Sequence, residues 1–202
     1  MYNNMQAVRM QVRRSQEERR AQTQRALVAA ARKLFAAKGF AATSTPEIVQ
    51  AAGVTRGALY HHFADKTALF AAVVEEEHLL MAMTINAAAE SDDEPGPIKA
   101  LMAGCDAFLD AMQDEGRRHI LLVDAPSVLG REALDAIDAR HGLETLICGL
   151  RDAMDAGAIR RLPVEALARL FGALFDRAAM AGPEELGDYR KSIKALIRGL
   201  KT

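Results

Sequence analysis

Apolar residues recur every three or four positions along most of the 202-residue chain, which is the spacing of amphipathic helices. Two such stripes near the C-terminus predict helices over residues 164–181 and 184–201. The chain lacks the sustained alternation of apolar and polar residues that is typical of half-buried strands. The pattern therefore predicts an all-α fold of about nine helices, over residues 15–38, 44–52, 55–62, 65–89, 98–114, 117–124, 129–156, 164–181 and 184–201.

Residues 43–66 differ from the rest, because they combine two short helices with a tight turn and few aliphatic side chains. Ser44 and Glu47 have the spacing of a capping box at the start of the first helix. Gly53 suits a left-handed turn, and Thr55 can cap a second helix in which only Leu59 is strongly aliphatic. Small and polar side chains on a helix after such a turn indicate a helix-turn-helix unit that reads DNA.

A longer motif runs from Ala52 to Phe70 and reads Ala-Gly-Val-Thr-Arg-Gly-Ala-Leu-Tyr-His-His-Phe-x-x-Lys-x-x-Leu-Phe. It resembles the DNA-binding signature of the TetR/AcrR family of one-component transcriptional regulators, over roughly residues 24–74. The resemblance implies an N-terminal three-helix DNA-binding domain and a larger C-terminal helical domain for ligand binding and dimerisation. Thr55 stands where the family often has serine, and Pro46 lies in the first turn of the first reading helix; both departures are compatible with the function.

Recognition helices present their N-terminal side chains to base edges in the major groove. Arg56 can bond to guanine or to a phosphate, and the sequence leaves both open; Ala58 can contact a thymine methyl group. By resemblance, Tyr60 and His61 lie against the sugar-phosphate backbone. The candidate DNA-binding residues are Thr43, Ser44, Thr45, Thr55, Arg56, Ala58, Tyr60, His61 and Lys66.

Other interpretations exist for some of these residues. Ser44 and Thr55 cap helices whether or not DNA is bound, and Thr43 can simply satisfy a buried backbone group. His61 and His62 invite a metal-binding interpretation, but adjacent helical residues point about 100° apart and cannot ligate one ion from the same face. We therefore expect neither a metal nor a cofactor.

Charge is distributed unevenly between the two ends of the chain. Residues 1–66 contain 11 Lys and Arg against 4 Asp and Glu, a net +7; the remainder contains 26 − 11 = 15 against 27 − 4 = 23, a net −8. A basic N-terminal part suits phosphate neutralisation. We expect a flexible basic arm over 1–14, which either contacts DNA or only aids solubility, then a DNA-binding domain over 15–66 and a helical domain over 67–202.

A single helix-turn-helix unit reads only a half-site, so a two-fold dimer would supply the second. By resemblance, the last two helices form the dimer surface, with candidates Leu167, Leu170, Leu174, Tyr189, Ile193, Leu196, Ile197 and Leu200. The middle of the C-terminal domain would enclose a small-molecule pocket. Its candidate lining residues are Met102, Cys105, Phe108, Leu109, Met112, Leu121, Leu122, Phe171 and Phe175, although Met or Phe at helical spacing is more often ordinary core.

The sequence excludes several other classes of protein. It has no nucleophile elbow, phosphate loop or metal-spaced cluster, so we expect no enzyme activity. It has no long apolar run or signal core, which predicts a cytoplasmic protein without a membrane partner. Cys105 and Cys148 are expected to be buried reduced thiols, with redox sensing as the alternative. The expected function is a homodimeric, ligand-responsive repressor of operator DNA; the alternatives are a TetR-like activator and a helical small-molecule-binding protein without sequence-specific DNA binding.

Overall fold

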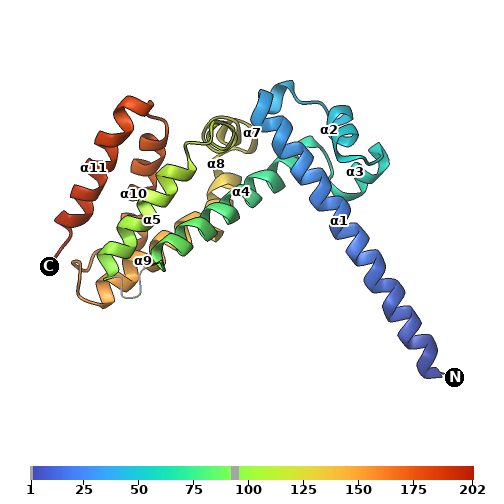
Figure 1. The fold of residues 1–202 in the computed structure, drawn as a ribbon, viewed down its shortest axis with the longest axis horizontal. Coiled ribbons are helices and arrows are strands. Elements are labelled where there is room, and N and C mark those ends of the chain that lie inside the picture. The colour runs from blue at the N-terminus through green and yellow to red at the C-terminus, as the bar shows by residue number, and fades with distance from the viewer. Residues whose placement is uncertain (1, 92–95) are drawn as a thin grey trace. The chain divides into compact units, whose positions relative to one another are not determined.

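The computed structural model describes the backbone of residues 2–91 and 96–202, and the side chains within these ranges from residue 16 onward. These residues are helical except for turns and one isolated antiparallel bridge, between Ile159 and Lys201. They form two compact units, Met1–Val73 and Val74–Thr202, which are described separately (Figure 1). The all-α prediction is confirmed. The division falls inside a helix at Val73, later than the expected limit at residue 66.

Unit 1 is a small helical cluster around one long helix. It consists of α1 (Tyr2–Ala42), α2 (Thr45–Ala52), α3 (Arg56–His62) and the first part of α4 (Lys66–Ala89). Its core contains fully buried apolar side chains from all four helices: Leu27, Ala31, Phe35, Ile48, Leu59, Leu69 and Phe70. The Phe35 and Phe70 rings meet edge-on, with centroids 5.1 Å apart. Aromatic edge-to-face packing thus fixes α4 on α1 beneath the two short helices.

Helix α1 is longer than the sequence pattern predicts. Its helical backbone begins at Tyr2, so residues 2–14 are helical where an irregular arm was expected. Glycine and proline are absent from residues 2–38, and Gln, Met, Ala and Arg are strong helix formers. The helix continues to Ala42 across a kink at Gly39, whose φ of 80° places it in a conformation that glycine adopts without strain.

The connection between α2 and α3 has the predicted helix-turn-helix geometry. Gly53 ends α2 with φ 65° and ψ 30°, in the left-handed region. The Thr55 hydroxyl oxygen then accepts a hydrogen bond from the Ala58 backbone N–H at 3.2 Å, which caps α3. The turn therefore needs glycine at its first position and a short polar side chain two residues later.

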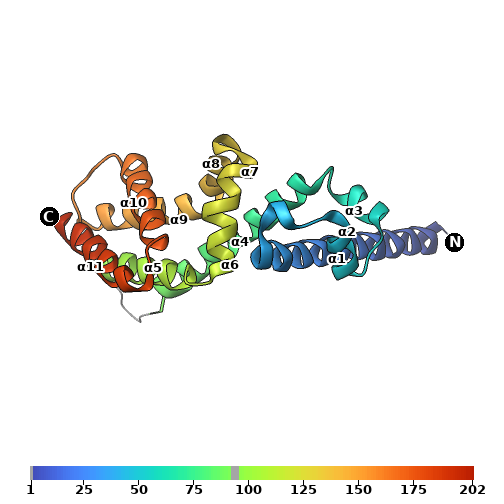
Figure 2. The ribbon, with the colours of Figure 1, turned by 90° about the horizontal axis from the view of Figure 1, so that it is seen from above.

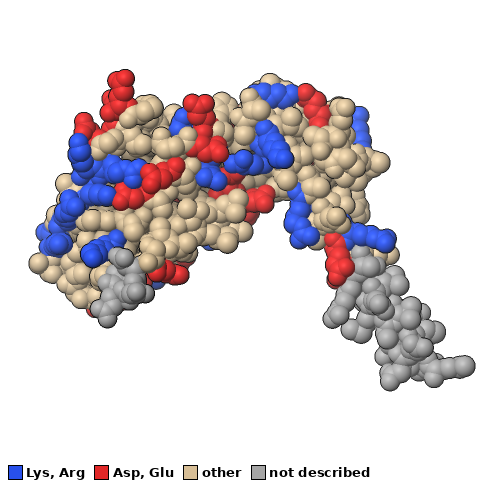
Figure 3. Space-filling model, in the orientation of Figure 1, with Lys and Arg blue, Asp and Glu red and all other residues tan. Residues whose placement is uncertain are grey.

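Unit 2 contains the rest of α4 and the helices that follow it (Figure 2). These are α5 (Pro97–Ala111), α6 (Glu115–Arg118), the π-helix η1 (His119–Asp124), α7 (Ala125–Leu129), α8 (Arg131–Arg140), α9 (Gly142–Asp155), α10 (Val164–Ala179) and α11 (Pro183–Gly199). Helix α5 packs against α9, α10 and α11. Acidic and basic side chains mingle on the face over α5 and α11 (Figure 3), where Arg190 of α11 binds Asp106 of α5 at 2.6 Å.

We expected one helix over residues 129–156, but the structure has two helices there, α8 and α9. The break lies at His141, which has φ −132° and ψ −84°. Its imidazole Nε2 lies 3.1 Å from a carboxylate oxygen of Glu75 in α4, and the Arg140 guanidinium binds the same carboxylate at 2.9 and 3.1 Å. Contacts between distant parts of the chain accompany the break, and the local apolar spacing does not reveal them.

Candidate DNA interface and internal cavity

Helix α3 presents a polar face to solvent. Leu59 is fully buried, whereas Arg56, Tyr60 and His61 are exposed. The Arg56 guanidinium carbon lies 5.6 Å from the centre of the Tyr60 ring, within cation–π range. Hydrogen bonding to Arg56, and to a smaller extent to Thr45 of α2, lowers the pKa of Tyr60. The two short helices thus hold a preorganised group of donors at one surface.

The start of α2 holds a second polar group. The Glu47 carboxylate accepts hydrogen bonds from the Ser44 backbone N–H at 2.9 Å and from the Ser44 hydroxyl at 2.7 Å. The Lys38 ammonium binds its other oxygen, and this ion pair, followed by the Ser44 hydrogen bonds, lowers the pKa of Glu47 to about 2. Ser44 remains exposed, but its hydroxyl proton is already donated to Glu47.

Thr43 and Lys66, two of the candidate DNA-binding residues, make intramolecular contacts in the structure, and for Thr43 this is the alternative that the sequence left open. The Thr43 side chain is buried, and its hydroxyl donates to the Gly39 carbonyl at 2.8 Å. The Lys66 ammonium donates to the carbonyl oxygens of Phe40 and Thr43, each at 2.9 Å, and lies 4.0 Å from the centre of the Phe40 ring. Both side chains instead stabilise the junction between α1 and α2, where carbonyl groups at a helix end need donors.

Unit 2 encloses a cavity of about 1100 Å³, which is open to solvent on one side. Its wall contains residues from α4, α5, η1, α8, α9 and α10, and most of its area is apolar. The sequence-based candidates that line it are Cys105, Phe108, Met112, Leu121, Leu122 and Phe175. Met102, Leu109 and Phe171 do not line it and belong instead to the core that α5, α10 and α11 share.

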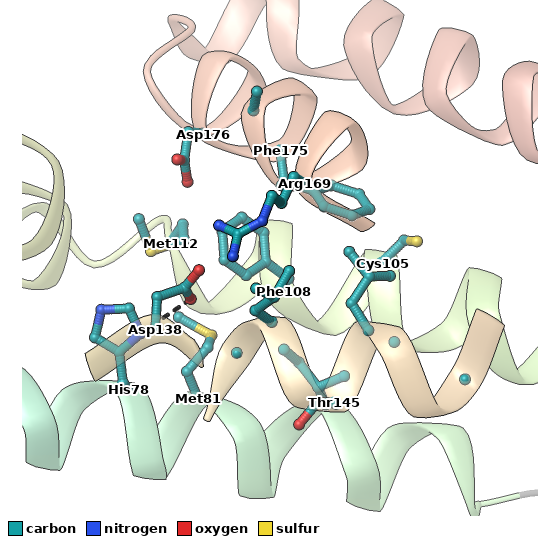
Figure 4. A pocket seen from close by; sticks show the side chains of 18 of the residues that line it. His78, Met81, Cys105, Phe108, Met112, Asp138, Thr145, Arg169, Phe175 and Asp176 are labelled. Atoms are coloured by element: carbon teal, nitrogen blue, oxygen red, sulfur yellow. Dashed lines mark ion pairs between the residues drawn. The ribbon is translucent and has the colours of Figure 1, made fainter. Parts of the chain in front are cut away.

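The polar part of the wall was not predicted. Four polar side chains from three helices point into the cavity (Figure 4): His78 of α4, Asp138 of α8, and Arg169 and Asp176 of α10. His78 Nδ1 lies 3.6 Å from an Asp138 carboxylate oxygen, but burial lowers the pKa of His78 and raises that of Asp138. One signal was available: Arg169 and Asp176 are seven residues apart, which places them on one face of a helix.

Asp176 is the most perturbed acid in this wall. Partial removal from solvent, and secondarily the negative charge of Asp138, raise the pKa of Asp176 to about 6. Within the described residues, Asp176 forms no hydrogen bond or ion pair of its own. Asp176 is nevertheless an exposed residue, so water can solvate its carboxylate, and a bound cation would replace that water.

The two cysteines differ in their surroundings. Cys105 is buried in the cavity wall, and burial raises its pKa to about 12, so the reactive thiolate is scarce at neutral pH. Cys148 is exposed, contrary to the expectation that both thiols are buried. Loss of solvent and the neighbouring Glu144 carboxylate raise its pKa as well.

The last two helices expose a row of leucines. Leu170, Leu174 and Leu196 are exposed, with Leu170 exposed by 66 %. Leu167, Tyr189 and Leu200 are half-buried. Ile193 and Ile197 were expected on a dimer surface, but both are buried in the chain's own core against α5 and α10. The apolar surface that α10 and α11 leave exposed for a partner is therefore narrower than the apolar stripes in their sequences suggest.

A helix-turn-helix unit with an exposed second helix, followed by an all-helical unit with a large cavity, defines the class of one-component DNA-binding regulators. Two family models match the chain: bacterial regulatory proteins, tetR family, over residues 27–73, and tetracyclin repressor-like, C-terminal domain, over residues 98–200. The chain belongs to the tetR family of bacterial regulatory proteins and is a DNA-binding transcriptional regulator.

Individual relatives agree with this family. The transposon Tn10 TetC protein of Escherichia coli is 26% identical over 86% of this chain and 87% of its own. The HTH-type transcriptional repressor Rv1474c of Mycobacterium tuberculosis is 35% identical over 41% of this chain and 42% of its own. The crystal structure of a TetR-family transcriptional regulator from Pectobacterium atrosepticum superimposes with a TM-score of 0.76 and 29% identity, covering 92% of this chain and 97% of that one.

None of the helices within residues 2–91 and 96–202 is long and apolar enough to cross a membrane.

Proposed function

We propose that this regulator is a homodimeric repressor that binds operator DNA and is released from it by a small molecule bound in the cavity of unit 2. The observation that carries the proposal is the combination in one chain of an exposed, preorganised Arg56–Tyr60 pair on α3 and a cavity of about 1100 Å³. Proteins named as repressors among the relatives support the sign of regulation. The cavity volume is large enough for a drug-sized ligand.

Arg56 is the side chain we assign to base reading, because it is exposed and follows the cap of α3. Around it, the sugar-phosphate backbone or a thymine methyl group would be contacted by Thr45, Ala58, Tyr60 and His61, and Thr55 would offer a backbone N–H at the start of α3. Ser44 would act through Glu47, because its N–H and hydroxyl already donate to that carboxylate. In a two-fold dimer, two such helices would enter successive major grooves, roughly 34–36 Å apart.

Helix α4 is the element we assign to ligand transmission. Within unit 2 its residues His78, Met81 and Ile85 line the cavity, and the same helix begins at Lys66 in unit 1. The α4 carboxylates Glu75 and Glu77 are held by Arg140 and Arg117 of the surrounding helices. A ligand that fits a different arrangement of these helices would shift the equilibrium by its difference in affinity for the two states.

DNA reading is tested with the purified chain and a fluorescent duplex carrying its own upstream DNA, beside an unrelated duplex, at two salt concentrations. We expect preferential binding to the upstream duplex, and loss of that preference by about tenfold or more in Arg56→Ala. Lys33→Ala, which removes an exposed positive charge from α1, should keep the preference. Equal, salt-sensitive binding of both duplexes would indicate only a basic surface, and no binding by folded dimer would favour a ligand carrier.

The sign of regulation and the role of ligand are tested separately. Transcription from the upstream promoter in vitro should fall when the regulator is added, whereas an activator would raise it. A library of small molecules of positive, negative and zero charge should contain compounds that release the duplex. If no compound of any charge affects DNA binding, the ligand-responsive part of the proposal is wrong.

A further inference from the structure

Some charged side chains of the cavity wall have a neighbour of opposite charge, and others do not. Those contributed by α8 and α10 are Arg131, Asp135, Asp138, Arg169, Asp176 and Arg177. The Arg169 charge favours the ionised form of Asp138. The Arg177 guanidinium lies 4.9 Å from the centre of the Tyr189 ring on α11. Among the residues that the structure describes, no ion pair joins any of the three arginines to Asp135 or Asp176, and the whole wall has five carboxylates, of Glu90, Asp135, Asp138, Asp152 and Asp176, against these three guanidinium groups.

The wall beside these acids is apolar and partly aromatic. The Phe108 and Phe175 rings lie 5.5 Å apart between centroids, and Met81 and Met112 flank the same space (Figure 4). A cation gains from the face of an aromatic ring as well as from a carboxylate, and methionine adapts to ligands of varied shape. One compartment therefore combines an excess of carboxylates with surfaces that take an apolar body.

We infer that the ligand of the cavity is an apolar cation, with an aromatic or alkyl body carrying one protonated amine, amidine or quaternary ammonium group that lies between Asp176 and Asp138. The inference rests on the proposed function, since it names the chemical class of effector that the regulator senses. Asp176 supplies the direct ionic contact, and the Phe108 and Phe175 rings hold the body of the ligand. An anionic ligand would instead meet a wall with more carboxylates than guanidinium groups.

Three matched probes test this class: 1-naphthylmethylamine, 1-naphthylmethanol and 1-naphthoic acid, which differ mainly in charge. The chain contains no tryptophan, so naphthalene emission reports binding with little interference. Near neutral pH we expect the ammonium probe to bind the full chain about tenfold more tightly than the alcohol or the carboxylate, because a charge-assisted hydrogen bond contributes a factor of this order. Asp176→Asn should reduce the preference to about twofold or less.

Asp188→Asn is the matched control, because it removes the same charge from an exposed α11 position outside the cavity wall. It should retain the full preference for the ammonium probe. Thermal unfolding of each variant establishes that it is folded. Equal binding of the three probes to the wild-type chain, tighter binding of the carboxylate, no binding of any probe, or an unchanged preference in Asp176→Asn would each overturn the inference.

The release assay of the proposed function separates the two proposals. If neutral or anionic compounds release the upstream duplex while cations do not, the ligand class is wrong and the repressor function stands. If cations release the duplex and Asp176→Asn requires higher concentrations of them, both are supported. If the protein does not recognise its upstream duplex but the ammonium preference is found, the cavity assignment stands and the DNA-binding proposal fails.

Discussion

Lys66 stabilises unit 1 through its ammonium group. This group donates two hydrogen bonds of 2.9 Å to the carbonyl oxygens of Phe40 and Thr43. Lys66→Met keeps an apolar side chain of similar length but removes the ammonium group from the Phe40 ring and from both carbonyls. We expect the free energy of unfolding to fall by about 1–3 kcal/mol, measured by urea unfolding. Lys33→Met, at an exposed position of α1, should change it by less than about 0.5 kcal/mol. Equal effects would show that Lys66 is only a surface charge.

Asp176 should lower the stability of the folded protein as pH rises. A salt-bridged acid does the opposite, because its ionised form stabilises the folded protein. Its folded pKa of about 6 lies above the ordinary aspartate value of 3.8, so the native state binds its proton more tightly than the unfolded state does. The resulting penalty is absent below the unfolded pKa, grows as pH rises to the folded pKa, and is complete above it. Asp176→Asn should therefore raise the melting temperature near pH 8 and leave it nearly unchanged near pH 4. A variant less stable than wild type at pH 8 would contradict this.

At the scale of elements, a buried ion pair joins α4 to α6. Glu77 is only 1% exposed, and its carboxylate lies 2.6 Å from Arg117 Nε; the Arg117 guanidinium also donates to the Ala111 carbonyl at 3.1 Å. Arg117→Met removes a positive partner of a buried carboxylate, which should cost on the order of 3 kcal/mol in chemical unfolding. Arg140→Met breaks the more exposed pair with Glu75 and should cost less than about 1 kcal/mol. Similar losses would mean that burial does not distinguish the two pairs.

A helix or turn can be predicted from the sequence when the residues that determine it lie within that helix or turn. Helices α10 and α11 agree with prediction within two residues, because long amphipathic stripes encode them locally. The turn at Gly53 follows from the backbone demand of one residue. The helix break at His141 could not be predicted in this way, because the His141 side chain contacts Glu75 in another helix. The polar end of the cavity was missed for the same reason: His78, Asp138 and Asp176 come together only when three helices pack.

At the scale of the whole molecule, the proposed dimer depends on the leucines that unit 2 leaves exposed. Leu170 is 66% exposed and Leu196 is 52% exposed, on the two helices whose inner faces are occupied by the chain's own core. In a two-fold interface each substitution occurs twice, so Leu170→Glu with Leu196→Glu would place four carboxylates there. Burying such charges without partners is unfavourable enough to prevent association.

We therefore expect wild-type protein to sediment as a dimer and the Leu170→Glu, Leu196→Glu variant as a folded monomer, since neither leucine contributes to the buried core. Leu162→Glu, at an exposed position outside the helices, should remain dimeric. Loss of the dimer should weaken binding to the upstream duplex by about a hundredfold, because the second recognition helix would no longer bind at high effective concentration. A double variant that stays dimeric would place the interface elsewhere, and a monomer that binds the duplex with undiminished affinity would show that one helix-turn-helix unit is sufficient.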